Sequence, residues 1–161
     1  ALPIGYGQTI SQPYMVASMT QILCETGAMG KVLEVGSGCG YQTVVLSAFA
    51  DKVFAVERIQ ALVKKLRTNL YELKIPNVKV RHLDGFNGWA EHAPFDAILV
   101  AAAPVGVPEK LLEQLVVGGR MVIPIGSGRR QELRLIKKNS TGFQEQVLDN
   151  VSFVPLLDGI E

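Results

Sequence analysis

The sequence predicts an α/β fold built on one mostly parallel sheet, and three observations predict it. Short apolar runs alternate with helical patterns along most of the 161 residues, which is typical of parallel strands joined by helices. A glycine-rich turn at 36–40 joins the first of these runs to a helical pattern. Two further β-like runs close the chain around Asn139-Ser140-Thr141-Gly142, and they predict an antiparallel hairpin at the end of the sheet.

The N-terminal half begins this alternation. Residues 1–12 carry glycines, hydroxyls and amides without a period, so we expect a loop there. A proline in the first turn and apolar residues at helical spacing then predict a helix that ends at Gly27. In the helix after the glycine turn, apolar residues at i, i+3, i+4, i+7 and i+8 predict the face that packs on the core. These residues are Tyr41, Val44, Val45, Ala48 and Phe49.

The other elements are predicted from the same two patterns, short apolar runs for strands and apolar residues at helical spacing for helices. The predicted strands lie at 31–35, 53–56, 78–82, 95–101, 120–125, 132–138 and 143–157. The predicted helices lie at 13–27, 41–49, 59–73 and 111–116. The run at 95–101 is apolar after Asp96, which is typical of a central strand buried on both faces.

Composition bounds the class of protein. A length of 161 residues fits one domain, and 48% hydrophobic with 19% charged residues is ordinary for a soluble α/β protein. No apolar run approaches the ~20 residues that span a bilayer. The net charge of +1, from 16 basic and 15 acidic residues, gives no overall field that would recruit nucleic acid. We therefore expect neither a membrane nor a nucleic-acid partner. We also expect a monomer.

The cysteines and the first residues bear on location. Cys24 and Cys39 have no metal-ligand spacing, so we expect no metal site, and unpaired cysteines agree with a reducing cytoplasm. The start Ala1-Leu2-Pro3 has no initiator Met and no visible targeting signal. We expect a cytoplasmic protein whose sequence is cut from a longer one.

The glycine turn favours a cofactor other than a dinucleotide. Glycine enters positive φ without a Cβ penalty, and the helix that follows offers free N–H groups to a ligand. The dinucleotide fingerprint G-x-G-x-x-G would need glycine where Tyr41 stands, which disfavours NAD. Glu57 ends the next strand, where its carboxylate can accept both hydroxyls of a ribose. Glu34, the turn and Glu57 together resemble S-adenosylmethionine-dependent methyltransferases.

Residues 2–16, LPIGYGQTISQPYMV, narrow the resemblance to one family, the protein-L-isoaspartate (D-aspartate) O-methyltransferases. Further matching segments cover nearly the whole chain: 32–43, 56–59, 84–89, 94–98, 118–124 and 151–156. The resemblance implies a Rossmann-like three-layer sandwich whose seven-stranded, mostly parallel sheet has an antiparallel C-terminal hairpin strand. It also implies a single domain over 1–161, without the N-terminal helical segment that usually precedes Leu-Pro-Ile in the family.

The resemblance also implies a role for particular residues. Ser11 is the residue implied at the reacting carboxylate, Glu57 at the ribose hydroxyls, and Asp84 with Gly85 at the adenine amine. Those implied to bind S-adenosylmethionine are Gln8, Thr9, Ile10 and Ser11; Glu34, Gly36, Ser37, Gly38 and Gly40; Glu57 and Arg58; and Asp84 and Gly85. The implied acceptor is the free α-carboxylate of L-isoaspartyl or D-aspartyl residues in damaged peptides and proteins, whose methylation initiates repair.

The chemistry of this acceptor suits the residues that are present. A carboxylate with a reference pKa near 4 is already an anionic nucleophile at pH 7, so no strong base is needed, and the two histidines form no catalytic constellation. Attack on a methyl sulfonium neutralises both charges, so catalysis rests on alignment, which can supply roughly 7 to 11 kcal/mol. Ser11 would position the carboxylate by a hydrogen bond.

Other interpretations of the same residues stay open. The glycine turn can join a strand to a helix without any ligand. Ser11-Gln12-Pro13 can be a helix N-cap, Asp84-Gly85 a strand-ending turn, and Trp89 a packing residue. The acceptor can be an RNA or a small molecule, although no aromatic-flanked Asn/Asp-Pro-Pro motif for a nucleobase occurs. The chain can also be a non-catalytic domain that binds S-adenosylmethionine.

Overall fold

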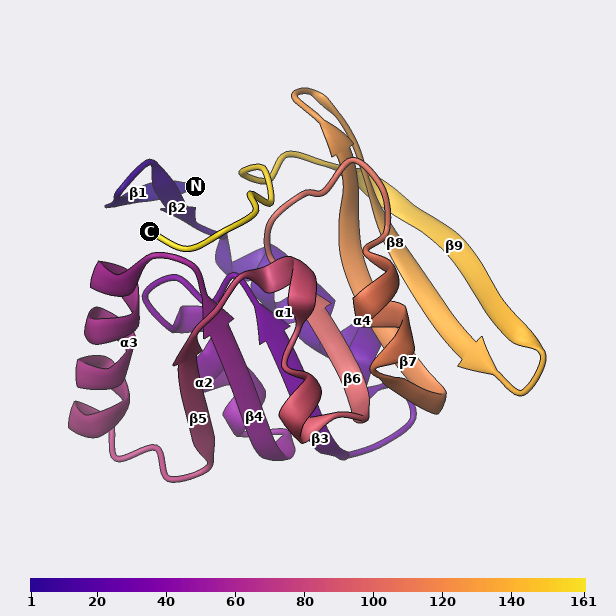
Figure 1. The fold of residues 1–161 in the computed structure, drawn as a ribbon, viewed down its shortest axis with the longest axis horizontal. Coiled ribbons are helices and arrows are strands. Elements are labelled where there is room, and N and C mark those ends of the chain that lie inside the picture. Colours follow the sequence, from indigo (N-terminus) through magenta and orange to yellow (C-terminus); the bar gives the residue numbers. More distant parts are fainter.

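A seven-stranded sheet forms the middle of the molecule in the computed structural model, which describes residues 1–161 (Figure 1). The strand order is β5-β4-β3-β6-β7-β8-β9. The strands are β3 (Met29–Val35), β4 (Ala50–Glu57), β5 (Val78–His82), β6 (Phe95–Val100), β7 (Leu115–Ser127), β8 (Arg130–Asn139) and β9 (Gly142–Val151). Neighbours from β5 to β7 pair in parallel, whereas β8 is antiparallel to both β7 and β9. The predicted C-terminal hairpin is confirmed, with β9 at the sheet edge.

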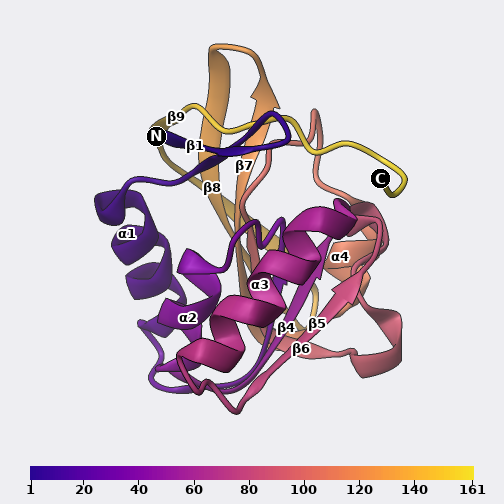
Figure 2. The ribbon, with the colours of Figure 1, turned by 90° about the vertical axis from the view of Figure 1, so that its left-hand side faces the viewer.

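Helices cover both faces of the sheet and complete the three layers (Figure 2). Helices α1 (Pro13–Cys24), α2 (Tyr41–Ser47) and α3 (Gln60–Glu72) lie on one face. The other face carries α4 (Glu109–Glu113) and two 3-10 turns, η1 (Gly85–Asn87) and η2 (Ala90–His92). Neighbouring strand residues belong to opposite cores, as for Val32 and Leu33, because side chains alternate across a sheet. None of the helices has the length and hydrophobicity that crossing a lipid bilayer requires.

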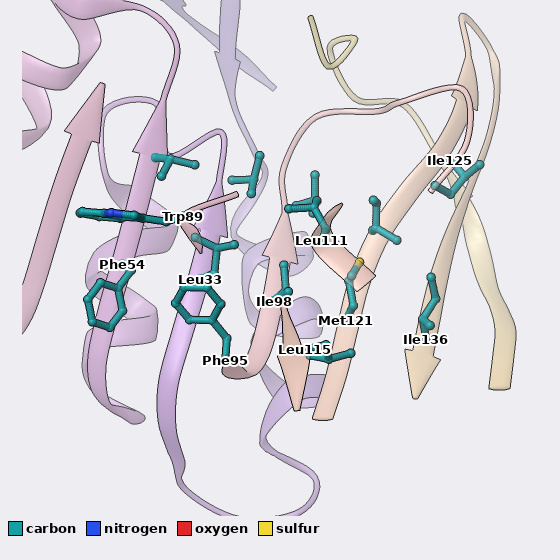
Figure 3. Close-up of a cluster of buried hydrophobic side chains, with 14 residues drawn as sticks. Leu33, Phe54, Trp89, Phe95, Ile98, Leu111, Leu115, Met121, Ile125 and Ile136 are labelled. Atoms are coloured by element: carbon teal, nitrogen blue, oxygen red, sulfur yellow. The ribbon is translucent and has the colours of Figure 1, made fainter. Parts of the chain in front are cut away.

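A cluster of buried apolar side chains packs between the sheet and α4 (Figure 3). Phe54 of β4 contacts Trp89 and Phe95 edge to face, with ring centroids 5.6 and 5.7 Å apart. Trp89 is 7% exposed. Edge-to-face pairs of this kind each add about 1 kcal/mol beyond the area they bury. Trp89 is therefore a packing residue.

Several predictions differ from the structure. The helix predicted to reach Gly27 ends at Cys24, and the strand predicted at 143–157 ends at Val151. Residues 1–12 form a hairpin, β1 (Leu2–Gly5) and β2 (Gln8–Ile10), instead of a loop, because Gly5 and Gly7 reverse the chain at positive φ and the strands are too short to show a period. The helix predicted at 111–116 stops at Glu113. Leu115 instead pairs with Phe95 in the sheet, where it is buried.

The core-facing side of α2 also differs from the prediction. The buried residues are Gln42, Thr43 and Leu46, whereas Phe49 is half exposed and lies beyond the end of the helix. Thr43 donates a hydrogen bond to Glu34, and Gln42 donates one to Thr20 of α1. These hydrogen bonds compensate for the burial of polar side chains, which the hydrophobic pattern alone cannot reveal.

Candidate active site

The predicted site lies where the central strands end. Gly36 follows β3, Arg58 follows β4 and Ala101 follows β6, so their positions meet at the carboxyl edge of the parallel sheet, where ligands bind in open α/β sheets. The N-terminal hairpin and the last residues of the chain pass above this edge (Figures 1 and 2). The two segments line one pocket at this edge: Ile4 comes from the hairpin and Leu156 from the last residues.

Three hollows meet at this edge, and each is named here after one of its residues. The Glu57 pocket is lined by Ile4, Gln8, Thr9, Val35, Gly36, Gly38, Val56, Glu57, Arg58, Gly85, Ala101, Ala102 and 154–157. The Gln42 pocket is lined by Ile4, Thr9, Ile10, Ser11, Val16, Gly36, Ser37, Gly38, Cys39, Tyr41, Gln42 and Ala101. The Ser152 groove is lined by Ala1, Thr9, Ser11, Gln12, Met15, Ala101 and 150–154.

Most of the predicted site residues come together around these hollows, and three do not. Glu34, Gly40 and Asp84 line none of the three. The remaining ten predicted residues line the Glu57 pocket or the Gln42 pocket, and Ser11 also lines the Ser152 groove.

Glu57 holds the glycine turn in place. Its Oε2 accepts a hydrogen bond of 2.9 Å from Gly38 N, and its Oε1 accepts one of 3.1 Å from Ile59 N. The turn also bonds to β4, with 3.0 Å from Gly36 N to Val56 O. Each carboxylate oxygen can accept two hydrogen bonds, so Glu57 keeps one lone pair on each oxygen for a ligand. That leaves a bidentate acceptor in the wall of the pocket, as two neighbouring ribose hydroxyls require.

Gly40 serves packing between helices. It precedes α2 with φ +102°, and a Cβ built there would lie 2.3 Å from Leu66 Cδ1 of α3. Gly38 differs, because a Cβ there would meet only Ile4 Cδ1, at 3.2 Å, between the two pockets. Of the glycines in the turn, Gly40 therefore lets α3 approach, while Gly36 and Gly38 line the pockets.

Gly40→Ala is expected to lower the free energy of unfolding by about 2 kcal/mol, since a positive φ costs a Cβ about 1 kcal/mol and overpacking against Leu66 adds at least as much. Urea denaturation measures this. The matched control is Gly27→Ala, at φ +108° with no atom within 4 Å of the new Cβ, which has only the backbone cost. Equal losses in the two variants would contradict the packing role.

Glu34 lies beneath the turn and is fully buried. Its Oε1 accepts a hydrogen bond from Thr43 Oγ1, whereas its Oε2 has no partner. Burial raises the pKa of Glu34 to about 7, the Thr43 hydroxyl lowers it in part, and the charge of Glu57 raises it further. Glu34 is thus a supporting residue under the turn, and contact with a cofactor stays a prediction.

The last residues of the chain are tied to the far side of the Glu57 pocket. Asp84 accepts hydrogen bonds from Phe86 N at 2.9 Å and from Gly159 N at 2.8 Å. Arg58 forms an ion pair of 3.0 Å with Glu161. Asp84 therefore serves as a turn residue, as the simpler interpretation expected, and like Glu57 it keeps one lone pair on each oxygen. Its place beside an adenine amine stays a prediction.

Ser11 lies between two of the hollows, and its hydroxyl makes no hydrogen bond within the chain. Across the groove, Gln131 clamps the backbone of Phe153, accepting from its N–H at 2.8 Å and donating to its carbonyl at 2.9 Å. Gln131 is buried on β8. It fixes the course of 150–154 opposite Ser11.

Sequence reasoning missed several residues of this site. Segment 154–157, Ala101 and Gln42 line the pockets, and Gln131 supports the groove. The segment belongs to a stretch that matched the family, but a match gives a residue no position in space. Polar residues inside an element, near its start, such as Gln42 and Gln131, were the available signal, because burial of an amide needs a reason.

The comparisons with known proteins agree with this geometry. The model of the family "Protein-L-isoaspartate(D-aspartate) O-methyltransferase (PCMT)" matches residues 1–161. A Pseudomonas aeruginosa protein-L-isoaspartate O-methyltransferase is 54% identical over 159 residues, which cover 99% of this chain and 75% of the relative. The enzyme of that name from Methylobacillus flagellatus is 54% identical over 163 residues, covering 99% and 73%.

Solved structures lead to the same family. A Plasmodium falciparum structure described as a protein-L-isoaspartate O-methyltransferase, in complex with S-adenosyl-L-homocysteine, has a TM-score of 0.85 at 31% identity, covering 97% of this chain and 79% of that one. The N-methyltransferase NodS of Bradyrhizobium japonicum, with a TM-score of 0.59 at 15% identity over 69% of this chain and 60% of its own, shares the fold alone. With the family model, the relatives and the site in agreement, this chain belongs to the protein-L-isoaspartate (D-aspartate) O-methyltransferase family.

Proposed function

We infer that this chain transfers a methyl group from S-adenosylmethionine to the free α-carboxylate of L-isoaspartyl and D-aspartyl residues in peptides and proteins. The observation that supports this most directly is the place of Ser11. Ser11 and Thr9 line the Gln42 pocket on one side and the Ser152 groove on the other. A methyl donor in the pockets and an acceptor in the groove would meet beside a free hydroxyl.

The residues present fit the donor. Glu57 offers two free lone pairs for the ribose hydroxyls, and Val56, Gly85 and Leu156 form a mostly apolar wall on which an adenine ring can lie. The Gln42 pocket adjoins the Glu57 pocket and shares Ile4 with it, so we assign the amino-acid end to the Gln42 pocket. When bound, S-adenosylmethionine supplies an electrophilic methyl on a positive sulfonium. The chain's own task is to hold that methyl toward the groove and to exclude water.

The groove fits a peptide carboxylate. An acceptor that is ionised at pH 7 needs orientation more than a base, and the Ser11 hydroxyl can donate a hydrogen bond to one carboxylate oxygen. The opposite wall, 150–154, is a stretch of backbone held by Gln131 and suited to lie along a peptide. No Lys or Arg lines the groove, and phosphate backbones are bound mainly through such side chains. These features favour a peptide over RNA.

The test is transfer of labelled methyl from S-adenosylmethionine to an isoaspartyl peptide, with the matching aspartyl peptide as control. Labelling of the isoaspartyl peptide alone supports the proposal. Binding of S-adenosylhomocysteine without labelling of either peptide would instead support a non-catalytic domain. Labelling of RNA in the same assay would favour the rival acceptor.

Ser11→Ala is expected to lower kcat/KM for the isoaspartyl peptide by roughly ten- to a hundredfold, because a hydrogen bond to a charged group contributes about 1.5 to 3 kcal/mol. The affinity for S-adenosylhomocysteine should change less than twofold. The matched control is Ser140→Ala in the exposed β8–β9 turn, which should leave both values unchanged. Full activity in Ser11→Ala would remove Ser11 from the proposed mechanism.

Partner, assembly and location belong to the same proposal. We propose that the chain acts as a cytoplasmic monomer on damaged peptides and proteins. Both cysteines are free in the structure, which suits a reducing compartment.

A further inference from the structure

Gln42 is a buried glutamine that the mechanism above does not use. It lies in the first turn of α2, is 8% exposed, and lines the pocket named after it. Its Nε2 lies 2.8 Å from Thr20 Oγ1 of α1, and Thr20 is itself 4% exposed. The amide thus joins α2 to α1 at the wall of the pocket.

The hydrogen bonds determine which end of the amide faces the pocket. Thr20 Oγ1 donates its single proton to Val16 O at 2.8 Å, so toward Gln42 it can only accept. The Gln42 nitrogen therefore faces Thr20, and Oε1 is the end left over. This oxygen accepts no hydrogen bond within the chain, and it is not enclosed, since the enclosed side-chain atoms without a partner are Glu34 Oε2 and Arg134 Nε.

The Gln42 pocket is electrically neutral. None of the twelve residues that line it carries a charged side chain. Two buried acids lie near this edge, and neither lines the pocket: Glu34 bonds to Thr43, and Glu57 faces the neighbouring pocket and accepts from Gly38 N. The amino-acid end of S-adenosylmethionine carries an ammonium and a carboxylate, and a neutral pocket must satisfy both with dipoles. For the ammonium it needs acceptors, and a carbonyl oxygen held by another element is better preorganised than a freely rotating hydroxyl.

Resting on the proposed function, we propose that Gln42 is a donor-specificity residue whose Oε1 accepts a hydrogen bond from the ammonium of the methionine moiety. Thr20 is its positioning residue. Gln42 thereby makes the chain select donors with an intact amino-acid end, while Glu57 holds the ribose. The two roles can be separated because Gln42 and Glu57 line different pockets. These pockets adjoin and share Ile4, Thr9, Gly36, Gly38 and Ala101.

Two probes separate this role from a structural one. S-adenosylhomocysteine has the amino-acid end, and 5′-methylthioadenosine lacks it. In calorimetric titration, Gln42→Leu is expected to bind S-adenosylhomocysteine at least tenfold more weakly, and 5′-methylthioadenosine within twofold of the parent chain. The control is Gln114→Leu, which removes another buried glutamine on the opposite face, bonded to Trp89 N and Asn87 O. It should leave the ratio of the two affinities unchanged.

Thr20→Val tests the tether. It keeps the shape of the side chain but removes the acceptor for the Gln42 amide, so S-adenosylhomocysteine should bind about threefold more weakly. The double variant should bind no more weakly than Gln42→Leu alone, because both changes act through one contact.

Three results would overturn the inference, and none depends on catalysis. These are equal losses for both probes in Gln42→Leu, an unchanged affinity for S-adenosylhomocysteine, or additive losses in the double variant. A failure of the proposed function looks different, because the parent chain would then bind S-adenosylhomocysteine but label no isoaspartyl peptide.

Discussion

Glu57→Gln is expected to bind S-adenosylhomocysteine about a hundredfold more weakly than the parent chain. Both oxygens of Glu57 accept from backbone N–H groups, Gly38 N and Ile59 N, at 2.9 and 3.1 Å. An amide has one oxygen, so its NH₂ must face one of these donors, and the turn or the start of α3 loses its anchor. The ribose hydroxyls lose the charged acceptor as well. Two weakened hydrogen bonds to a charged group, at about 1.5 kcal/mol each, correspond to about a hundredfold.

Calorimetric titration with S-adenosylhomocysteine measures this loss, at a temperature where far-UV circular dichroism shows that both variants are folded. Glu72→Gln is the matched control, since Glu72 is exposed at the end of α3 and makes no hydrogen bond. Its affinity should stay within twofold of the parent value. If Glu57→Gln bound as tightly as Glu72→Gln, the ribose would be held elsewhere, and the assignment of the Glu57 pocket to the nucleoside would be wrong.

The sequence was most informative where the apolar pattern repeats many times and the contacts are between residues close in the chain. Helix α3 was expected at 59–73 and runs from Gln60 to Glu72, because its stripe repeats through several turns. The run at 95–101 became β6, one of the central strands. Glycines followed by an acid at the end of the next strand identified the turn and Glu57, since both depend on chain geometry within a single strand-helix-strand unit.

What could not be predicted depends on contacts between distant segments. Leu115 continues a helical stripe in the sequence, yet pairing with Phe95 draws it into β7. Gly40 matches a ligand turn, yet its neighbour is Leu66, from a helix whose approach no local pattern encodes. Hydrophobic periodicity predicted the wrong core-facing side of α2. Gln42 and Thr43 can be buried there because they bond to Thr20 and Glu34. In the Ser152 groove, the backbone of Phe153 is held by Gln131, which lies 22 residues earlier in the chain.

Glu34→Gln is expected to remove a pH dependence of stability of about 3 kcal/mol. The folded chain keeps the Glu34 proton up to about pH 7, whereas the ordinary pKa is 4.5. Between these values the folded state holds more protons than the unfolded state, so the free energy of unfolding falls as the pH rises through this window. At 1.36 kcal/mol per pKa unit the fall amounts to about 3 kcal/mol. The amide of the Glu34→Gln variant does not titrate. Its free energy of unfolding should therefore match that of the parent near pH 4.5 and exceed it at pH 8.

Urea denaturation of both chains at pH 4.5 and pH 8 isolates this effect, because the other titrating groups are common to the two and cancel in the difference. Thr43→Val is the companion variant. Its hydroxyl bonds to Glu34 and lowers the pKa of that carboxyl, so removing it should make the loss of stability toward pH 8 larger than in the parent. A parent and a Glu34→Gln variant that lose stability in parallel would mean that folding leaves the pKa of Glu34 at its ordinary value. A buried partner for Oε2, or water beneath the glycine turn, would then be required.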